Sequence, residues 1–145
     1  MLIVIAAIVG ACVLGVGALG FIGWHAMHSG GNSVQVGSSA NVSESDLGVS
    51  IYPAAEHLAN GSVKVKVGNM LTVTSTYTTS DPASSVVSYY QDKMGNMTTS
   101  QNGRATTLTS FTLDGNMKES IVVTVTPGLQ DGGPTKIMIA HTRTN

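Results

Sequence analysis

The chain has 145 residues, few charges and one cysteine, and these features exclude several classes of protein. Lys and Arg number 7 and Asp and Glu 8, for a net charge of -1, and none of these residues precedes Glu44. Without a basic cluster, nothing favours binding to the phosphates of nucleic acid. The single cysteine, Cys12, excludes a disulfide framework and a cysteine-ligated zinc site within one chain.

Residues 1–28 are predicted to form a membrane anchor. From Leu2 to Trp24 the sequence carries no charge, and as a helix this run extends over about 34 Å, slightly more than a hydrocarbon core of about 30 Å. The run is longer than the apolar part of a secretory signal, no Lys or Arg precedes it, and "GWHAMH" is a poor cleavage site. We therefore expect an uncleaved single-pass transmembrane helix, with membrane lipid as one partner.

Small residues in this segment indicate that it packs against another helix. Ala7, Ala11 and Gly15 are spaced four apart on one face, while Gly10 and Gly17 are seven apart on a neighbouring face. Small side chains let membrane helices approach closely, and close packing holds such helices together in lipid. We expect the partner to be another transmembrane subunit or a copy of the chain. The alternative is that glycine is simply common in membrane helices.

Three residues are expected at the membrane surface. Trp24 lies where the helix leaves the bilayer, a position at which an indole buries its ring and keeps its N–H in water. His25 and His28 are one helical turn apart. We interpret them as interfacial polar residues, and the alternative is a metal or pH-sensing pair without a third ligand. No flanking Lys or Arg orients the helix, so the Ser/Thr-rich character of the remaining chain is what favours a periplasmic or extracellular location.

Residues 29–46, "SGGNSVQVGSSANVSESD", are predicted to be a flexible linker because they are rich in Gly, Ser and Asn. Residues 47–145 then form the domain. Alternation over 63–67 and 71–77, around Gly68-Asn69, predicts a β-hairpin with its valines, Leu71 and Tyr77 facing inward and Lys or Thr facing outward.

Three further strands and several turns follow from the same signals. Alternation predicts strands at 106–113, 121–125 and 137–141. Asn60-Gly61, Asn102-Gly103 and Asp114-Gly115 accept the positive φ of tight turns, so we expect each of them at a strand boundary.

A helix is predicted between the hairpin and these strands. Asp81 is expected to cap it, Pro82 to occupy its first position and Gly95 to end it. The residues at helical spacing form one apolar face: Ala83, Val86, Val87, Tyr90 and Met94. Tyr89 lies off this stripe and is either an exposed contact or packed at its edge. The predicted fold is α+β, an antiparallel sheet with one helix packed on a face, in the order β-β-α-β-β-β.

Two stretches, "GVSIYPAAEH" before the hairpin and "YTTSDPASSVVSYYQDKM" at the helix, carry a resemblance. With the terminal strands ending in "KIMIAHT", residues 48–142 resemble small bacterial membrane-anchored domains, acidobacterial proteins among them, that have an "IYPGA"-like opening and an "SDxxxxVxxFY" helix. Ala54 replaces the glycine of the first motif, and Tyr89 stands where phenylalanine is frequent. The resemblance implies an N-terminal membrane helix and a domain outside the cytoplasm.

Candidate catalytic groups are few. The sequence contains no nucleophile elbow, no phosphate-binding glycine loop and no HExxH motif. His57 and His141 are interpreted as ordinary side chains with hydrogen-bond partners. We therefore expect no enzymatic activity, cofactor or metal.

The leading hypothesis is a structural or interaction subunit of a larger membrane or cell-surface assembly. A second hypothesis is a pilin-like filament subunit, whose apolar N-terminal helices form the fibre core; against it, residue 5 is Ile where type IV pilins carry glutamate. A third is a ligand-sensing or metal-sensing head that uses His25, His28 or His57.

Overall fold

A computed structural model of the chain describes residues 34–37, 42–114, 117–130 and 132–144. The predicted anchor, with its helix-packing residues and its three membrane-surface residues, lies outside these ranges. Neither of the helices in the described part of the chain has the length and apolar character needed to cross a membrane.

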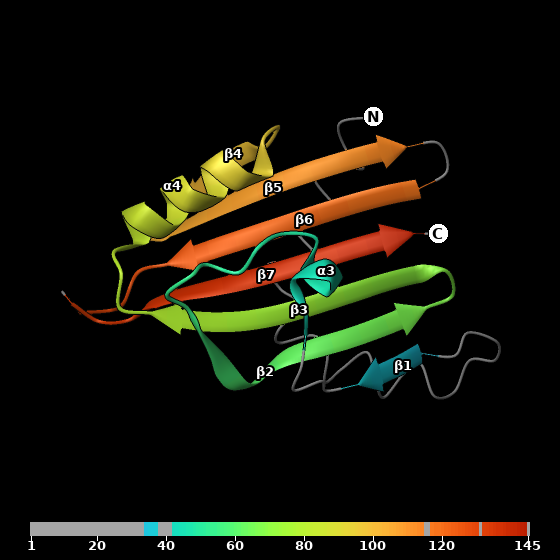
Figure 1. Cartoon of the computed structure of the whole chain (residues 1–145), viewed down its shortest axis with the longest axis horizontal. Helices are drawn as coiled ribbons and strands as arrows, with labels where there is room; N and C mark the ends of the chain where they lie inside the picture. Colours follow the sequence, from blue (N-terminus) through green and yellow to red (C-terminus); the bar gives the residue numbers. More distant parts are fainter. Residues whose placement is uncertain (1–33, 38–41, 115–116, 131, 145) are drawn as a thin grey trace. The chain divides into compact units, whose positions relative to one another are not determined.

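An antiparallel sheet with a helix packed on one face forms the domain, which confirms this part of the predicted fold (Figure 1). The strands lie in the order β1-β2-β3-β7-β6-β5-β4, and every neighbouring pair is antiparallel. Their bounds are β1 Val34–Gly37, β2 Glu56–Val67, β3 Met70–Thr79, β4 Thr98–Asn102, β5 Ala105–Asp114, β6 Met117–Thr126 and β7 Thr135–Thr144.

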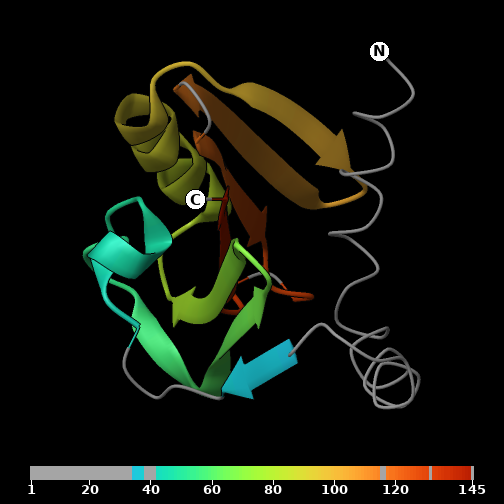
Figure 2. The ribbon, with the colours of Figure 1, turned by 90° about the vertical axis from the view of Figure 1, so that its right-hand side faces the viewer.

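Two helices lie on the same face of this sheet (Figure 2). Helix α4, Ala83–Met94, contacts β5 and β6, and the short helix α3, Glu44–Leu47, contacts β3 and β7. The predicted apolar stripe of α4 is confirmed, because Val86 and Tyr90 are fully buried and the other three members pack against the core. Beneath the helices lie buried side chains of four strands: Val73, Tyr77, Leu108, Val123, Val125, Ile137 and Ile139.

The start of α4 differs from the prediction. Its N-cap is Pro82, which provides no side-chain cap, and the carboxylate of Asp81 instead accepts a hydrogen bond from the Tyr52 hydroxyl. The predicted capping role of Asp81 is therefore wrong. The helix ends before Gly95, which has a positive φ of 62°, a conformation in which glycine is favoured over other residues.

Val63, Val65 and Val67 of the first hairpin face the opposite way from the prediction, whereas Val73 is buried in the core as predicted. A two-residue turn at Gly68-Asn69 pairs Val67 with Met70, and this register places Val63 opposite Thr74 and Lys64 opposite Val73. Side chains of cross-strand partners lie on the same face of a sheet. Lys64 and Lys66 are therefore on the helix-covered face with Val73, while the three valines are on the other face. The inward positions predicted for Leu71 and Tyr77 are correct.

Asn60-Gly61 does not mark a strand boundary but lies within β2, where a bulge separates the His57 and Ser62 pairings. Asn60 has a positive φ of 59°. At Gly61 a side-chain Cβ would lie 2.8 Å from the Leu58 carbonyl oxygen, so the bulge requires glycine. Asn102-Gly103, by contrast, does separate two strands, β4 and β5, as predicted.

Three elements were not predicted. Strand β1 lies within the predicted linker, helix α3 spans the end of that linker, and strand β4 precedes the first strand predicted after α4. A capping box explains α3: Asp46 N–H donates to Ser43 Oγ, and Ser43 N–H donates back to Asp46 Oδ2. Lys64 Nζ lies 3.2 Å from the Asp46 carboxylate and ties α3 to β2.

We expect this capping box to make stability depend on pH. Hydrogen bonds from Ser43, followed by the contact with Lys64, hold the pKa of Asp46 below its ordinary value of 3.8. A carboxylate with a lowered pKa stabilises the fold fully above the unfolded-state pKa, and this contribution is lost as pH falls through the folded-state pKa. Asp46→Asn should therefore lower the free energy of unfolding by about 0.5–1 kcal/mol at pH 6, and by less at pH 2.5.

Chemical unfolding of the full chain in detergent at the two pH values measures this difference. Ser43→Ala is the matched variant, because it removes the main cause of the lowered pKa and should reduce the pH dependence as well. An equal effect of Asp46→Asn at both pH values would contradict the prediction.

Candidate interaction surface

The two sequence motifs that carry the resemblance are in direct contact. Tyr52, from "IYPAA", donates its hydroxyl to Asp81 Oδ2 at 2.7 Å, and its backbone N–H donates to the buried Tyr90 hydroxyl at 3.2 Å. Asp81 is held in turn by Thr135, whose hydroxyl donates to the Asp81 carbonyl at 2.7 Å. The hydrogen bond to Asp81 raises the pKa of Tyr52, and burial raises the pKa of Tyr90. These contacts fasten the loop before β2 onto α4.

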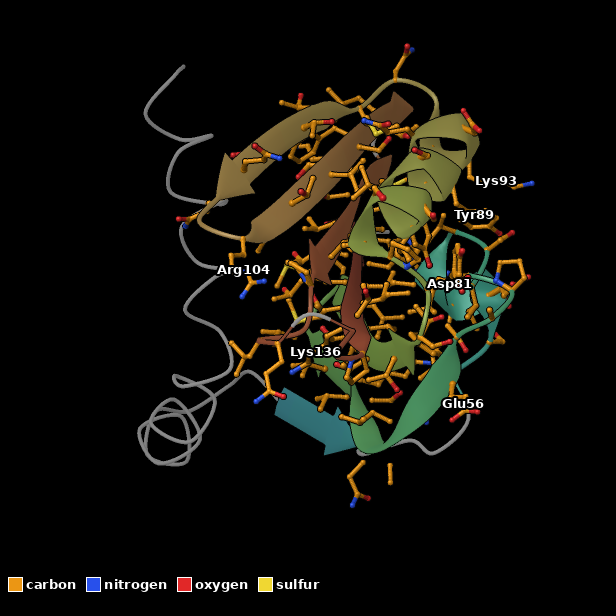
Figure 3. All side chains as sticks on the ribbon, turned by 90° about the vertical axis from the view of Figure 1, so that its left-hand side faces the viewer. Glu56, Asp81, Tyr89, Lys93, Arg104 and Lys136 are labelled. Carbon is orange, nitrogen blue, oxygen red and sulfur yellow. The ribbon has the colours of Figure 1, made fainter. Side chains whose placement is uncertain are left out.

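Tyr89 is half-buried at the margin of this contact. Its ring centroid lies 5.2 Å from that of Tyr52 and 5.2 Å from that of Tyr90, both in edge-to-face geometry, and its hydroxyl donates to the Ile51 carbonyl at 3.4 Å. Lys93 Nζ lies 5.8 Å from the centroid of the Tyr89 ring. Figure 3 shows Tyr89, Lys93 and Asp81 along one side of the domain, whereas Arg104 and Lys136 lie on the other.

A shallow hollow of about 340 Å³ opens beside these tyrosines. Tyr52, Pro53, Ala54, Asp81, Ser85 and Tyr89 line it. The Asp81 carboxylate already accepts the Tyr52 hydroxyl, and both tyrosine rings pack on protein. Three of the lining side chains are therefore already engaged in holding the loop on α4.

His57 forms a hydrogen-bonded chain with two serines. Its Nε2 lies 2.7 Å from Ser62 Oγ, which lies 2.7 Å from Ser75 Oγ. A His–Ser pair is the core of many nucleophilic sites, but such a site needs a hydroxyl that substrate can reach. Ser62 is only 2% exposed and Ser75 is fully buried. The chain thus joins β2 to β3 next to the bulge.

His141 is also buried among hydrogen-bond partners, at 2% exposure. Its Nδ1 lies 2.6 Å from the Asp46 carbonyl oxygen and its Nε2 lies 2.6 Å from Glu119 Oε1. A carbonyl oxygen only accepts, so Nδ1–H donates to Asp46. His141 therefore links α3 to β6 and β7. Nowhere in the described ranges do three or more His, Cys, Asp or Glu side chains gather as a metal site requires.

Both described helices lie on one face of the sheet, and neither covers the other face (Figure 2). Threonines predominate there, and two pairs, Thr72–Thr142 and Thr107–Thr124, have hydroxyl oxygens 3.1 and 3.4 Å apart. The apolar members of this face, assigned from strand register and alternation, include Val63, Val65, Val67, Met70, Val122, Met138, Ala140, Phe111 and Leu113. Between Lys118 at one end of the face and Glu56 and Lys136 at the other, the strand residues described there are uncharged.

The most exposed apolar residues within the strands lie near the end of β5. Phe111 is 51% exposed and Leu113 is 77% exposed, and both point away from the face on which Leu108 is buried. Large apolar side chains gathered at an exposed site are typical of contact surfaces between proteins.

The backbone of the same segment has one free edge. Strand β4 pairs with residues 105–109 of β5 and with none beyond, while β6 pairs with β5 as far as Asp114. No described strand therefore lies on the outer side of residues 110–114, although Figure 1 shows β5 continuing past α4 and β4. Alternate N–H and C=O groups of this segment point outward and can pair with another strand. We call residues 110–114 the β5 end segment.

Comparisons of the chain with known protein families, with curated proteins and with solved structures gave no match in any of the three. The resemblance to the membrane-anchored bacterial domains thus stays a prediction from the two motifs.

The sequence left Tyr89 as either an exposed contact or a residue packed at the edge of the stripe, and the structure shows it packed there against Tyr52 and Tyr90. The β5 end segment was not predicted. The alternation over 106–113 was visible, but it does not show where the neighbouring strand stops. The sequence signal was the pair Phe111 and Leu113, whose neighbours in the chain, Ser110, Thr112 and Asp114, are all polar.

Proposed function

We propose that this protein is a non-enzymatic, single-pass membrane protein whose domain serves as an interaction or structural subunit of a larger assembly. Residues 1–28 are its anchor, and the domain lies on the periplasmic or extracellular side. The support for the anchor is the uncharged run from Leu2 to Trp24, which is long enough to span a bilayer. The small residues between Ala7 and Gly17 then pack on a neighbouring helix.

One observation carries the interaction role of the domain. The β5 end segment combines exposed apolar side chains with an unpaired strand edge. A soluble domain without a partner normally protects such an edge by a charge, a proline or a covering loop, because it otherwise pairs with other chains. Asp114, the last residue of the segment, is its one charged member, and Ser110, Phe111, Thr112 and Leu113 carry neither a charge nor a proline.

Co-purification from solubilised membranes tests the proposal with the intact chain. We expect the wild-type protein to retain companion chains and the double variant Phe111→Lys/Leu113→Lys to lose most of them. Leu129→Lys is the matched control, because Leu129 is 91% exposed but lies in the loop after β6. It should retain the companions as the wild type does.

Three results would speak against the proposal. If the double variant retains the companion chains as the wild type does, the β5 end segment is not part of the contact. Mature protein that begins after residue 28 would show that residues 1–28 are not a retained anchor. Fibres in negative-stain images of sheared cell-surface material would favour the pilin-like filament subunit instead.

A further inference from the structure

We propose that the β5 end segment pairs with the same segment of a second copy of the chain, as two antiparallel strands related by a two-fold axis. This inference rests on the proposed function and names its partner. The two domains then share one continuous sheet that extends across the contact.

The shape of the free edge restricts what binds there. The edge spans residues 110–114, with the start of β4 at one end, because Thr98 pairs with Thr109. At the other end β5 turns into β6 after Asp114. An incoming strand that continues past the edge in the direction of Thr98 meets β4, so the strand must stop or turn there. The β5–β6 hairpin of a second copy turns at that point, because its own strand ends at Asp114.

The sequence of the segment is complementary to itself. Antiparallel pairing about Thr112 places Phe111 opposite Leu113 of the second copy, and Leu113 opposite its Phe111. Both residues lie on the same face of the sheet, so the four apolar side chains come together. Ser110 falls opposite Asp114, so no like charges face each other. A two-fold axis satisfies both copies with one set of contacts, as in most homodimers.

The other free edges are less suited to such pairing. Strand β4 is five residues long with only polar side chains, all of them exposed. On the opposite side of the sheet, the outermost strand β1 is only four residues long, and the part of β2 that it leaves unpaired contains the bulge. Bulges and short polar strands are features that prevent edge pairing. Anchoring of both copies in one membrane raises their effective concentration, so that a short strand contact is sufficient.

Cysteine cross-linking of the full chain in membranes tests the register directly. With Cys12→Ala as background, Thr112→Cys places two thiols directly opposite each other. The Cα atoms of directly opposite residues lie about 4.5–5.5 Å apart, which a disulfide can bridge. Ser110→Cys is the matched control two residues away. In this register its two copies are offset by four residues, about 14 Å along the strands, which is too far for a disulfide.

We expect mild oxidation to convert the Thr112→Cys protein to disulfide-linked dimer while the Ser110→Cys protein stays monomeric. Adding Phe111→Lys/Leu113→Lys to Thr112→Cys should abolish the dimer. Thr112 is exposed, so its replacement leaves the fold intact.

Absence of the Thr112→Cys dimer, or equal cross-linking of both cysteine variants, would overturn the inference. If companion chains of a different kind still co-purify in that case, the proposed function stands and the second copy is excluded as the partner. If nothing co-purifies either, both proposals fail.

Discussion

Tyr90→Ala is expected to lower the free energy of unfolding by about 3–5 kcal/mol. The Tyr90 side chain is fully buried between α4 and the sheet, so its removal leaves a cavity and loses the apolar contacts of the ring. It also removes the hydroxyl that accepts the Tyr52 N–H and so weakens the attachment of the loop before β2. Chemical unfolding of the full chain in detergent, followed by circular dichroism, measures the loss.

Two related variants separate the causes of this loss. Tyr90→Phe keeps the ring and removes only the hydroxyl, and should cost about 1 kcal/mol. Tyr89→Ala removes a half-buried ring from the same helix and should cost less than Tyr90→Ala. If both alanine variants lose the same free energy of unfolding, the deeper burial of Tyr90 adds no stability over that of Tyr89, and the prediction is wrong.

His141→Leu is expected to cost about 3 kcal/mol, because it removes the hydrogen-bond partner of two acceptor groups. The Asp46 carbonyl and the Glu119 carboxylate both lie 2.6 Å from the His141 ring. Leucine fills much of the space but offers neither group a hydrogen bond. We further expect α3 to loosen, because Asp46 belongs to that helix.

Thermal unfolding gives the total cost, and amide hydrogen exchange over residues 43–48 reports on α3 itself. Glu119→Gln is the matched control, because glutamine keeps an oxygen beside Nε2 and leaves the Nδ1 bond intact. It should cost less than His141→Leu and should leave exchange in α3 unchanged. Slow exchange in α3 of the His141→Leu protein would show that this histidine does not hold the helix.

Much of the architecture follows from periodicity. The alternation over 106–113, 121–125 and 137–141 lies within β5, β6 and β7, and the stripe through Val86 and Tyr90 is the face of α4 that the core buries. These predictions succeed because core positions carry apolar residues at the period of the element. The error on Val63 and its neighbours arose from treating valine as inward. A two-residue turn at Gly68-Asn69 requires 63 to pair with 74, so register outweighs residue type.

Other features depend on contacts that periodicity does not reveal. Strand β4, "TTSQN", has no apolar residue, and its place at the sheet edge comes from its pairing with β5. Asp81 precedes a helix with proline at its start, which is the usual pattern of a cap. Its carboxylate instead accepts a hydrogen bond from Tyr52, which lies far from it in sequence. Helix α3 had a visible signal, because Ser43 and Asp46 have capping-box spacing, but it lies in a Ser-rich stretch typical of linkers.

The β5 end segment could not be predicted from the sequence for a similar reason. Phe111 and Leu113 alternate correctly for a strand with one buried face, but they belong to the face that the described helices leave uncovered. Only the position at which β4 stops shows that the backbone beside them is unpaired.

The central claim is that the outward backbone groups of residues 110–114 are paired in the assembled protein. Amide hydrogen exchange on the intact chain, purified from membranes, measures this in the wild type and in Phe111→Lys/Leu113→Lys. We predict that peptides covering 110–114 exchange more slowly in the wild type than in the double variant, while 98–102 in β4 exchange equally in both. Equally fast exchange of 110–114 in the two proteins would contradict the account.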